Sequence, residues 1–150
     1  MTTANELMLI GVYAALCPAL LGATVIDWRT RVLPNPLVLF IALTGLITQA
    51  FASGLIGGAV ALSGALIGLI GLLPFYLLGG MAAGDVKLMA AVGAWFSPQG
   101  ALLTVVLSIL AGGVLGLLFV VARRRHEGLP YATAIAAGTF ASLFYPRSVL

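Results

Sequence analysis

Asp27 and Asp85 are the only aspartates in the chain, and each lies at one end of an apolar run. A carboxylate at the centre of a membrane-spanning helix costs about 2.5–3.5 kcal/mol, so an aspartate kept near membrane depth predicts a function. Two close carboxylates cannot readily both ionise, and one then keeps a proton at neutral pH. Such a pair can activate water with its charged member and polarise a peptide carbonyl with the protonated one.

Each aspartate also has a structural interpretation. Asp85 follows a glycine and precedes an apolar segment, where an N-cap residue is expected, and Lys87 can offset its charge. Asp27 opposes the macrodipole at the end of the first apolar segment, although Arg29 or Arg31 can neutralise it at a membrane interface. Taken singly, both interpretations stay open, and the pair is more specific than either member.

Other chemistries lack their residues. His126 is the only histidine and lies in a short charged stretch with Glu127, which is typical of a solvated loop. Cys17 is the only cysteine, so zinc sites with paired cysteines are excluded. The glycine-rich run before Asp85 does not end in Gly-Lys-Ser/Thr, so a phosphate-binding loop is not supported. The sequence predicts catalysis with no metal and no cofactor.

The composition predicts that lipid is the solvent for most of the chain. Of the 150 residues, 62% are hydrophobic and only 7% are charged, whereas soluble domains carry about 25% charged residues. The net charge is +3, but the few basic residues stand in short stretches between apolar runs, which argues against nucleic-acid binding.

The apolar runs predict a single all-α domain over residues 1–150, a bundle of six transmembrane helices with a short fourth helix. Met1–Glu6 contain no Lys or Arg, so the first run is predicted to be a retained helix rather than a secretion signal. The six segments are Leu7–Ile26, Pro36–Ala52, Leu55–Leu78, Val86–Phe96, Ala101–Ala122 and Leu129–Tyr145.

Six of the seven basic residues fall on one side of this alternating topology, and Arg147 falls on the other. The six are Arg29, Arg31, Lys87, Arg123, Arg124 and Arg125. By the positive-inside rule their side is the cytoplasm, so both termini are expected on the periplasmic side. Both aspartates then lie toward the cytoplasmic face.

The fourth segment is too short to cross a bilayer. A helix from Asp85 to Ser97 rises only about 18 Å, against a hydrocarbon core of about 30 Å. The glycine-rich run 79–84 is not expected to be regular helix, and irregular backbone at membrane depth needs protein or a water-filled cavity around it. Asp85 is therefore predicted to lie in a recess that water enters.

Small residues recur at a spacing of four in several segments. This spacing lets helices approach closely in lipid, although any one pair can also reflect membrane composition. The pairs are Gly54 and Gly58, Gly64 and Gly68, and Gly112 and Gly116. They predict a compact bundle without specifying which helices meet.

Two motifs make the chain resemble the type IV prepilin peptidases, and among them the short members that process Flp-type pilins. Residues 27–35, Asp-Trp-Arg-Thr-Arg-Val-Leu-Pro-Asn, resemble the segment around that family's first catalytic aspartate. Residues 79–88, Gly-Gly-Met-Ala-Ala-Gly-Asp-Val-Lys-Leu, resemble its GxGD segment. Ala82 replaces the first glycine of GxGD, a change that would be disfavoured if the backbone there required a positive φ.

The resemblance implies an aspartyl endopeptidase of the bacterial inner membrane, with Asp27 and Asp85 catalytic. Its expected partner is a prepilin whose short basic leader is removed at the cytoplasmic membrane boundary, and N-methylation of the product stays open. Gly84, Lys87, Arg31 and Asn35 are second-rank candidates for orienting the aspartates or the substrate. The oligomeric state is not predicted.

Two other functions stay in play. The aspartates of a small transporter or channel would bind protons or a cation on a permeation route, although both lie toward one face here. A noncatalytic scaffold for pilus assembly would explain the Ala82 change as lost activity. Cleavage of a prepilin separates the endopeptidase from both.

Overall fold

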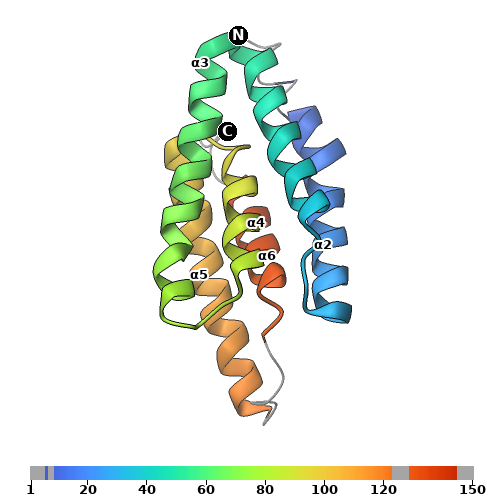
Figure 1. The fold of residues 1–150 in the computed structure, drawn as a ribbon, viewed down its shortest axis with the longest axis vertical. Helices are drawn as coiled ribbons and strands as arrows, with labels where there is room; N and C mark the ends of the chain where they lie inside the picture. Colours follow the sequence, from blue (N-terminus) through green and yellow to red (C-terminus); the bar gives the residue numbers. More distant parts are fainter. Residues whose placement is uncertain (1–5, 7–8, 123–128, 145–150) are drawn as a thin grey trace.

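The structure is a computed structural model that describes residue 6 and residues 9–122 and 129–144, and within these the regular structure is entirely helical. A π-helical turn, η1, spans Val12–Leu16 and continues into α2, Cys17–Thr30. The helices α3, Asn35–Leu77, and α4, Ala83–Gly93, follow. Then come α5, Pro98–Val121, and α6, Tyr131–Leu143 (Figure 1).

The π-helical turn ends at Leu16, two residues before Pro18, which is the second residue of α2. A proline ring crowds the carbonyl four residues earlier and removes one backbone donor, and a wider turn relieves that crowding. The N–H of Cys17 accordingly donates to the carbonyl of Val12, five residues back. The first helix thus continues to Thr30, so Asp27 lies inside its last turn.

The helix α3 turns back on itself at Ser53 and Gly54. A straight helix of 43 residues would be about 65 Å long, twice the thickness of a bilayer core. Ser53 and Gly54 leave the helical region, and Gly54 has a φ of 62°, which glycine adopts without penalty. The limbs 35–52 and 55–77 run in opposite directions, and α4 lies between them (Figure 1).

These limbs coincide with the second and third predicted segments. The described residues nevertheless contain five α-helices, and α4 and α6 have only 11 and 13 residues. The all-α membrane fold is confirmed, whereas the number of six transmembrane helices stays a prediction.

The short helix α4 is enclosed by its neighbours. Trp95 just beyond its end is fully buried, and its indole N–H donates to the carbonyl of Ile41 at 2.9 Å. The side chain of Gln49 donates to the carbonyl of Trp95 at 3.3 Å. Two buried hydrogen bonds therefore fix the far end of α4 to the first limb of α3.

Glycines let the second limb of α3 lie against the backbone of α4. A Cβ added to Gly64 would collide with the carbonyl oxygen of Gly93, and one added to Gly68 would collide with that of Met89. This pair at a spacing of four thus lies at a helix contact. Gly58 and Gly116 face open space, which agrees with the compositional interpretation for them, whereas Gly54 is explained by the positive φ of the turn.

The outer surface of the bundle is apolar. Phe51, Leu55 and Leu78 are 81%, 95% and 85% exposed, an arrangement that water would oppose and lipid favours. Among the described residues, three stretches are long and apolar enough to cross a membrane: Leu9–Thr30, Asn35–Leu77 and Pro98–Val121.

The helix ends that were predicted to face the cytoplasm lie at one end of the bundle. The end of α2, the start of α4, the end of α5 and the start of α6 all lie at the lower end of Figure 1. Asp27 and Asp85 are therefore on the same side of the bundle. Arg123, Arg124, Arg125, His126, Glu127 and Arg147 lie outside the described residues. The orientation of this end in the membrane stays a prediction.

Candidate active site

Asp27 is positioned by the last turn of α2 and by the first turn of α6. Its side chain is 6% exposed, and its Oδ2 accepts a hydrogen bond of 3.1 Å from the backbone N–H of Ala132. The first N–H groups of a helix have no partners within the helix and carry a partial positive charge. The α6 N-terminus, which has no side-chain cap, thus stabilises a negative charge on Asp27.

Asp85 lies in the first turn of α4 and is also 6% exposed. The N-cap is Ala82, so the interpretation of Asp85 itself as the N-cap is wrong by three positions. The Oδ2 of Asp85 accepts a hydrogen bond of 3.2 Å from the N–H of Ala82. The Asp85 side chain thus provides a partner for a backbone N–H at the start of α4, as the acidic residue of a capping box does.

Ala82, which replaces the first glycine of the GxGD motif, fits the backbone conformation at that position. Ala82 has φ −81° and ψ 153°, an extended conformation open to any residue. Within the two aspartate motifs, positive φ values occur instead at Gly79, with 75°, and at Arg31, with 57°. The alanine therefore creates no strain at the start of α4.

Both aspartates line the same two cavities. The first cavity, of about 250 Å³, is formed with the loop 79–82 and with Leu129 and Tyr131. The second, of about 290 Å³, is formed with the segment after α2 and the first turn of α4. The second contains all six residues singled out in the sequence: Asp27, Arg31, Asn35, Gly84, Asp85 and Lys87. Their roles stay predictions.

The two carboxylates interact electrostatically. Asp85 lies outside the three stretches long enough to span a membrane. Burial, and then the negative charge of Asp27, raise the pKa of Asp85 from 3.8 to about 6, against an opposing effect of the Ala82 N–H. Asp85 is thus suited to hold a proton, and the N–H of Ala132 favours the charged form of Asp27.

Arg31 lines both cavities. It ends α2 in a left-handed conformation, and its N–H donates to the carbonyl of Asp27 at 3.0 Å. Within the described part of the chain its side chain forms no ion pair with Asp27, and its buried Nη1 has no hydrogen-bond partner. A buried donor without a partner is costly, so Nη1 is a donor available to a ligand in the cavity.

Tyr131 and the N–H of Ala132 belong to the site but were not singled out in the sequence. Tyr131 lines the first cavity, and Gly112 leaves room for its ring. The sequence placed the start of the sixth segment on the same face as the aspartates, which was the available signal. The backbone N–H of Ala132, however, could not be predicted from residue type, because every residue except proline has one.

Trp28 forms a second link between α2 and α6. Its indole N–H donates to Thr133 Oγ1 at 2.7 Å.

Trp28→Phe and Thr133→Val should each lower the thermal stability in detergent slightly, because one hydrogen bond contributes about 0.5–1.5 kcal/mol. In a double-mutant cycle the two losses should not add. Fully additive losses would show that this bond does not connect the helices.

The arrangement can perform acid–base chemistry on one bond. It places two buried carboxyl groups, of which Asp85 has a raised pKa, and an unpartnered guanidinium nitrogen around a space large enough for water. No group of three or more metal-ligating side chains occurs among the residues that were placed.

Fold and site together define a helical membrane protein with a pair of buried carboxylates in one cavity. The chain belongs to the type IV leader peptidase family, whose profile matches residues 14–117. This finding agrees with the resemblance carried by the two aspartate motifs.

Three bacterial relatives named prepilin leader peptidase/N-methyltransferase illustrate the similarity. The protein of Burkholderia pseudomallei strain 1026b is 35% identical over 143 residues, 87% of this chain and 45% of the relative. That of Stutzerimonas stutzeri is 37% identical over 119 residues, 74% and 40% of the two chains. That of Aeromonas hydrophila is 31% identical over 143 residues, 87% and 48%. The chain thus spans about half the length of these relatives or less, and no solved structure matches it significantly.

Proposed function

We propose that the chain is a membrane-embedded aspartyl endopeptidase that removes the short basic leader of Flp-type prepilins in pilus biogenesis. The observation that carries the proposal is the presence of two buried aspartates, from helices far apart in sequence, in the same two cavities. The printed names of the relatives support a prepilin as substrate. Methyl transfer stays open.

The proposed reaction starts from one proton shared unequally by the pair. Asp27 takes a proton from a water molecule in the cavity, and the water oxygen attacks the scissile carbonyl carbon. Asp85 gives its proton to the carbonyl oxygen, which yields a neutral tetrahedral intermediate. Asp27 then returns its proton to the leaving nitrogen as the C–N bond breaks, and a hydroxyl proton of the intermediate restores Asp85.

The surrounding residues have supporting roles in this proposal. The unpartnered Nη1 of Arg31 donates to a substrate carbonyl beside the scissile bond. Gly84 lines the second cavity beside Asp85, and a Cβ added to it would only reach ordinary van der Waals contact with Leu33 at 3.4 Å. Asn35 and Lys87, which also line the second cavity, contact the substrate backbone.

The proposed location is the bacterial inner membrane, with both termini in the periplasm and the aspartates facing the cytoplasm. A scissile bond at the cytoplasmic boundary lies between a basic leader in water and an apolar helix in lipid. The pair of carboxylates at one end of the bundle fits such a bond. Cysteine labelling from either side of the membrane tests the orientation.

The experiment that tests the function is co-expression of the chain with an Flp-type prepilin in cells that lack other prepilin peptidases. The expected result is a shortened pilin whose new N-terminus, read by mass spectrometry, lies between leader and apolar helix. Uncleaved prepilin beside a folded, membrane-inserted chain would contradict the endopeptidase and favour a scaffold or a transporter.

A further inference from the structure

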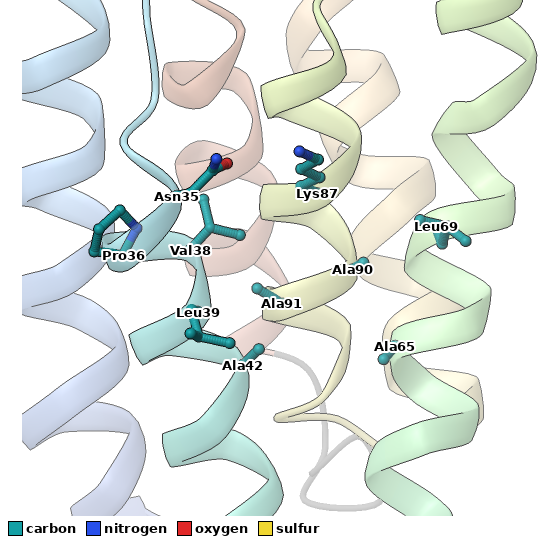
Figure 2. A pocket seen from close by; sticks show the side chains of 10 residues that line it. All are labelled: Asn35, Pro36, Val38, Leu39, Ala42, Ala65, Leu69, Lys87, Ala90 and Ala91. Carbon is teal, nitrogen blue, oxygen red and sulfur yellow. The ribbon is translucent and has the colours of Figure 1, made fainter.

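An apolar groove of about 580 Å³ lies on the side of the bundle, between the two limbs of α3 and over α4 (Figure 2). The first limb of α3 contributes one wall with Val38 and Leu39, and the second limb contributes the other with Leu69. Ala42 and Ala65 on the two limbs and Ala90 and Ala91 on α4 complete the lining. The groove faces sideways, into the region that lipid would occupy.

The alanines leave room for another helix. Small residues let helix backbones approach closely in lipid, where packing replaces the hydrophobic effect as the attractive force. Four alanines from three helical segments meet in this groove. From Asn35 to Ala42 the first limb rises about 10 Å, which is two helical turns. The groove therefore has the length and lining to receive two turns of an apolar helix.

The groove leads to the aspartates. Asn35 and Lys87 line its one polar end and also line the second aspartate cavity. In Figure 2 these two side chains lie together at one end of the groove, and Ala42 and Ala65 lie at the other. A chain that lies in the groove as a helix can thus continue past Asn35 and Lys87 as an extended strand toward the carboxylates.

We propose that this groove binds the first two turns of the substrate's apolar helix, directly after the scissile bond. The inference rests on the proposed function for the identity of the helix. A peptide bond in a helix must leave its regular hydrogen bonding before a water molecule can attack it. A groove that holds the helix and ends at Asn35 and Lys87 positions that transition beside Asp27 and Asp85.

Cross-linking tests the contact without relying on catalysis. The background variant carries Cys17→Ala, which removes the native cysteine, and Asp85→Asn, which prevents cleavage. Ala65→Cys is added to this variant, and the prepilin carries one cysteine in the first two turns of its apolar helix. A short bismaleimide then joins the two cysteines if they lie close together. Gly113→Cys is the matched control, because Gly113 lies on α5 and faces open space. The expected yield at Ala65→Cys is about ten-fold that of the control, equivalent to 1.4 kcal/mol of preference.

Filling the groove tests the same contact by kinetics. Ala65→Leu and Ala42→Leu should each raise the KM for the membrane-embedded prepilin about ten-fold with little change in kcat, because they remove docking energy and leave the aspartates in place. Gly113→Leu should leave both constants unchanged. Unchanged KM values in both groove variants would overturn the proposal.

The outcomes separate the groove from the function. Equal cross-linking at Ala65→Cys and Gly113→Cys would overturn the groove even if the intact chain cleaves prepilin, and would leave lipid as its occupant. Strong cross-linking at Ala65→Cys without cleavage by the intact chain would contradict the endopeptidase and support the groove as a binding site for an apolar helix.

Discussion

We expect that replacing Asp27 or Asp85 with asparagine abolishes the proposed leader removal while the bundle stays folded. Asparagine keeps the size of each side chain and can still accept from Ala132 or Ala82, but it neither takes nor gives a proton. Loss of a positioned acid or base costs about 10²–10⁴-fold in rate. Each variant should therefore fall by at least about 10²-fold in a cleavage assay with purified prepilin.

Glu6→Gln is the matched control for this prediction. Glu6 carries an exposed carboxyl group near the start of the chain and lines none of the cavities described above. Its replacement removes one negative charge and should leave the cleavage rate unchanged. Either asparagine variant that keeps the rate of the parent protein would refute the site, although it would leave the proposed substrate intact.

Gly64→Ala should lose the packing of α4 against α3. The added methyl group would collide with the carbonyl oxygen of Gly93, a backbone atom that no rotamer change can move aside. Overpacking costs about 1–3 kcal/mol where side chains can adapt, and a backbone contact leaves less room to adapt. We expect a clearly lower midpoint of thermal unfolding in detergent, and loss of cleavage as well, since α4 carries Asp85.

Gly58→Ala provides the opposite case on the same limb. Gly58 has no atom within 4 Å of an added Cβ, and alanine is favoured over glycine in a helix by about 1 kcal/mol. The midpoint of this variant should stay the same or rise. Equal destabilisation by the two alanines would show that the backbone contact between Gly64 and Gly93 does not hold α4 in place.

The aspartates could be found in the sequence because ionisable groups are scarce in it. With two aspartates in 150 residues, each is visible against an apolar background, and the alternation of segments predicts that both share one end of the bundle. The structure does bring Asp27 and Asp85 to the same cavities. The hydrophobic periodicity of the segments does not show how close Asp27 and Asp85 come to each other, because that distance depends on how the helices pack.

The partners of the aspartates could not be found in this way. Asp27 is held by the backbone of Ala132, and a backbone donor is the same for every residue except proline. Gly64 and Gly68 were visible as a pair at a spacing of four, but the sequence did not show that they face α4. The turn at Ser53 and Gly54 was visible as a break between apolar segments.

The most direct test of the central claim is a pH titration of the two carboxylates by NMR, with ¹³C at the aspartate Cγ. The chain contains only two aspartates, so the protein in micelles gives two signals and Asp27→Asn leaves the signal of Asp85 alone. We predict a transition for Asp85 near pH 6 in the parent protein, and at lower pH in Asp27→Asn, because the charge of Asp27 contributes to the raised pKa. Burial, the larger cause, remains in the variant, so the pKa should stay above 3.8. An Asp85 transition that is the same with and without the Asp27 carboxylate would contradict the account, since the two groups would then not act as a pair.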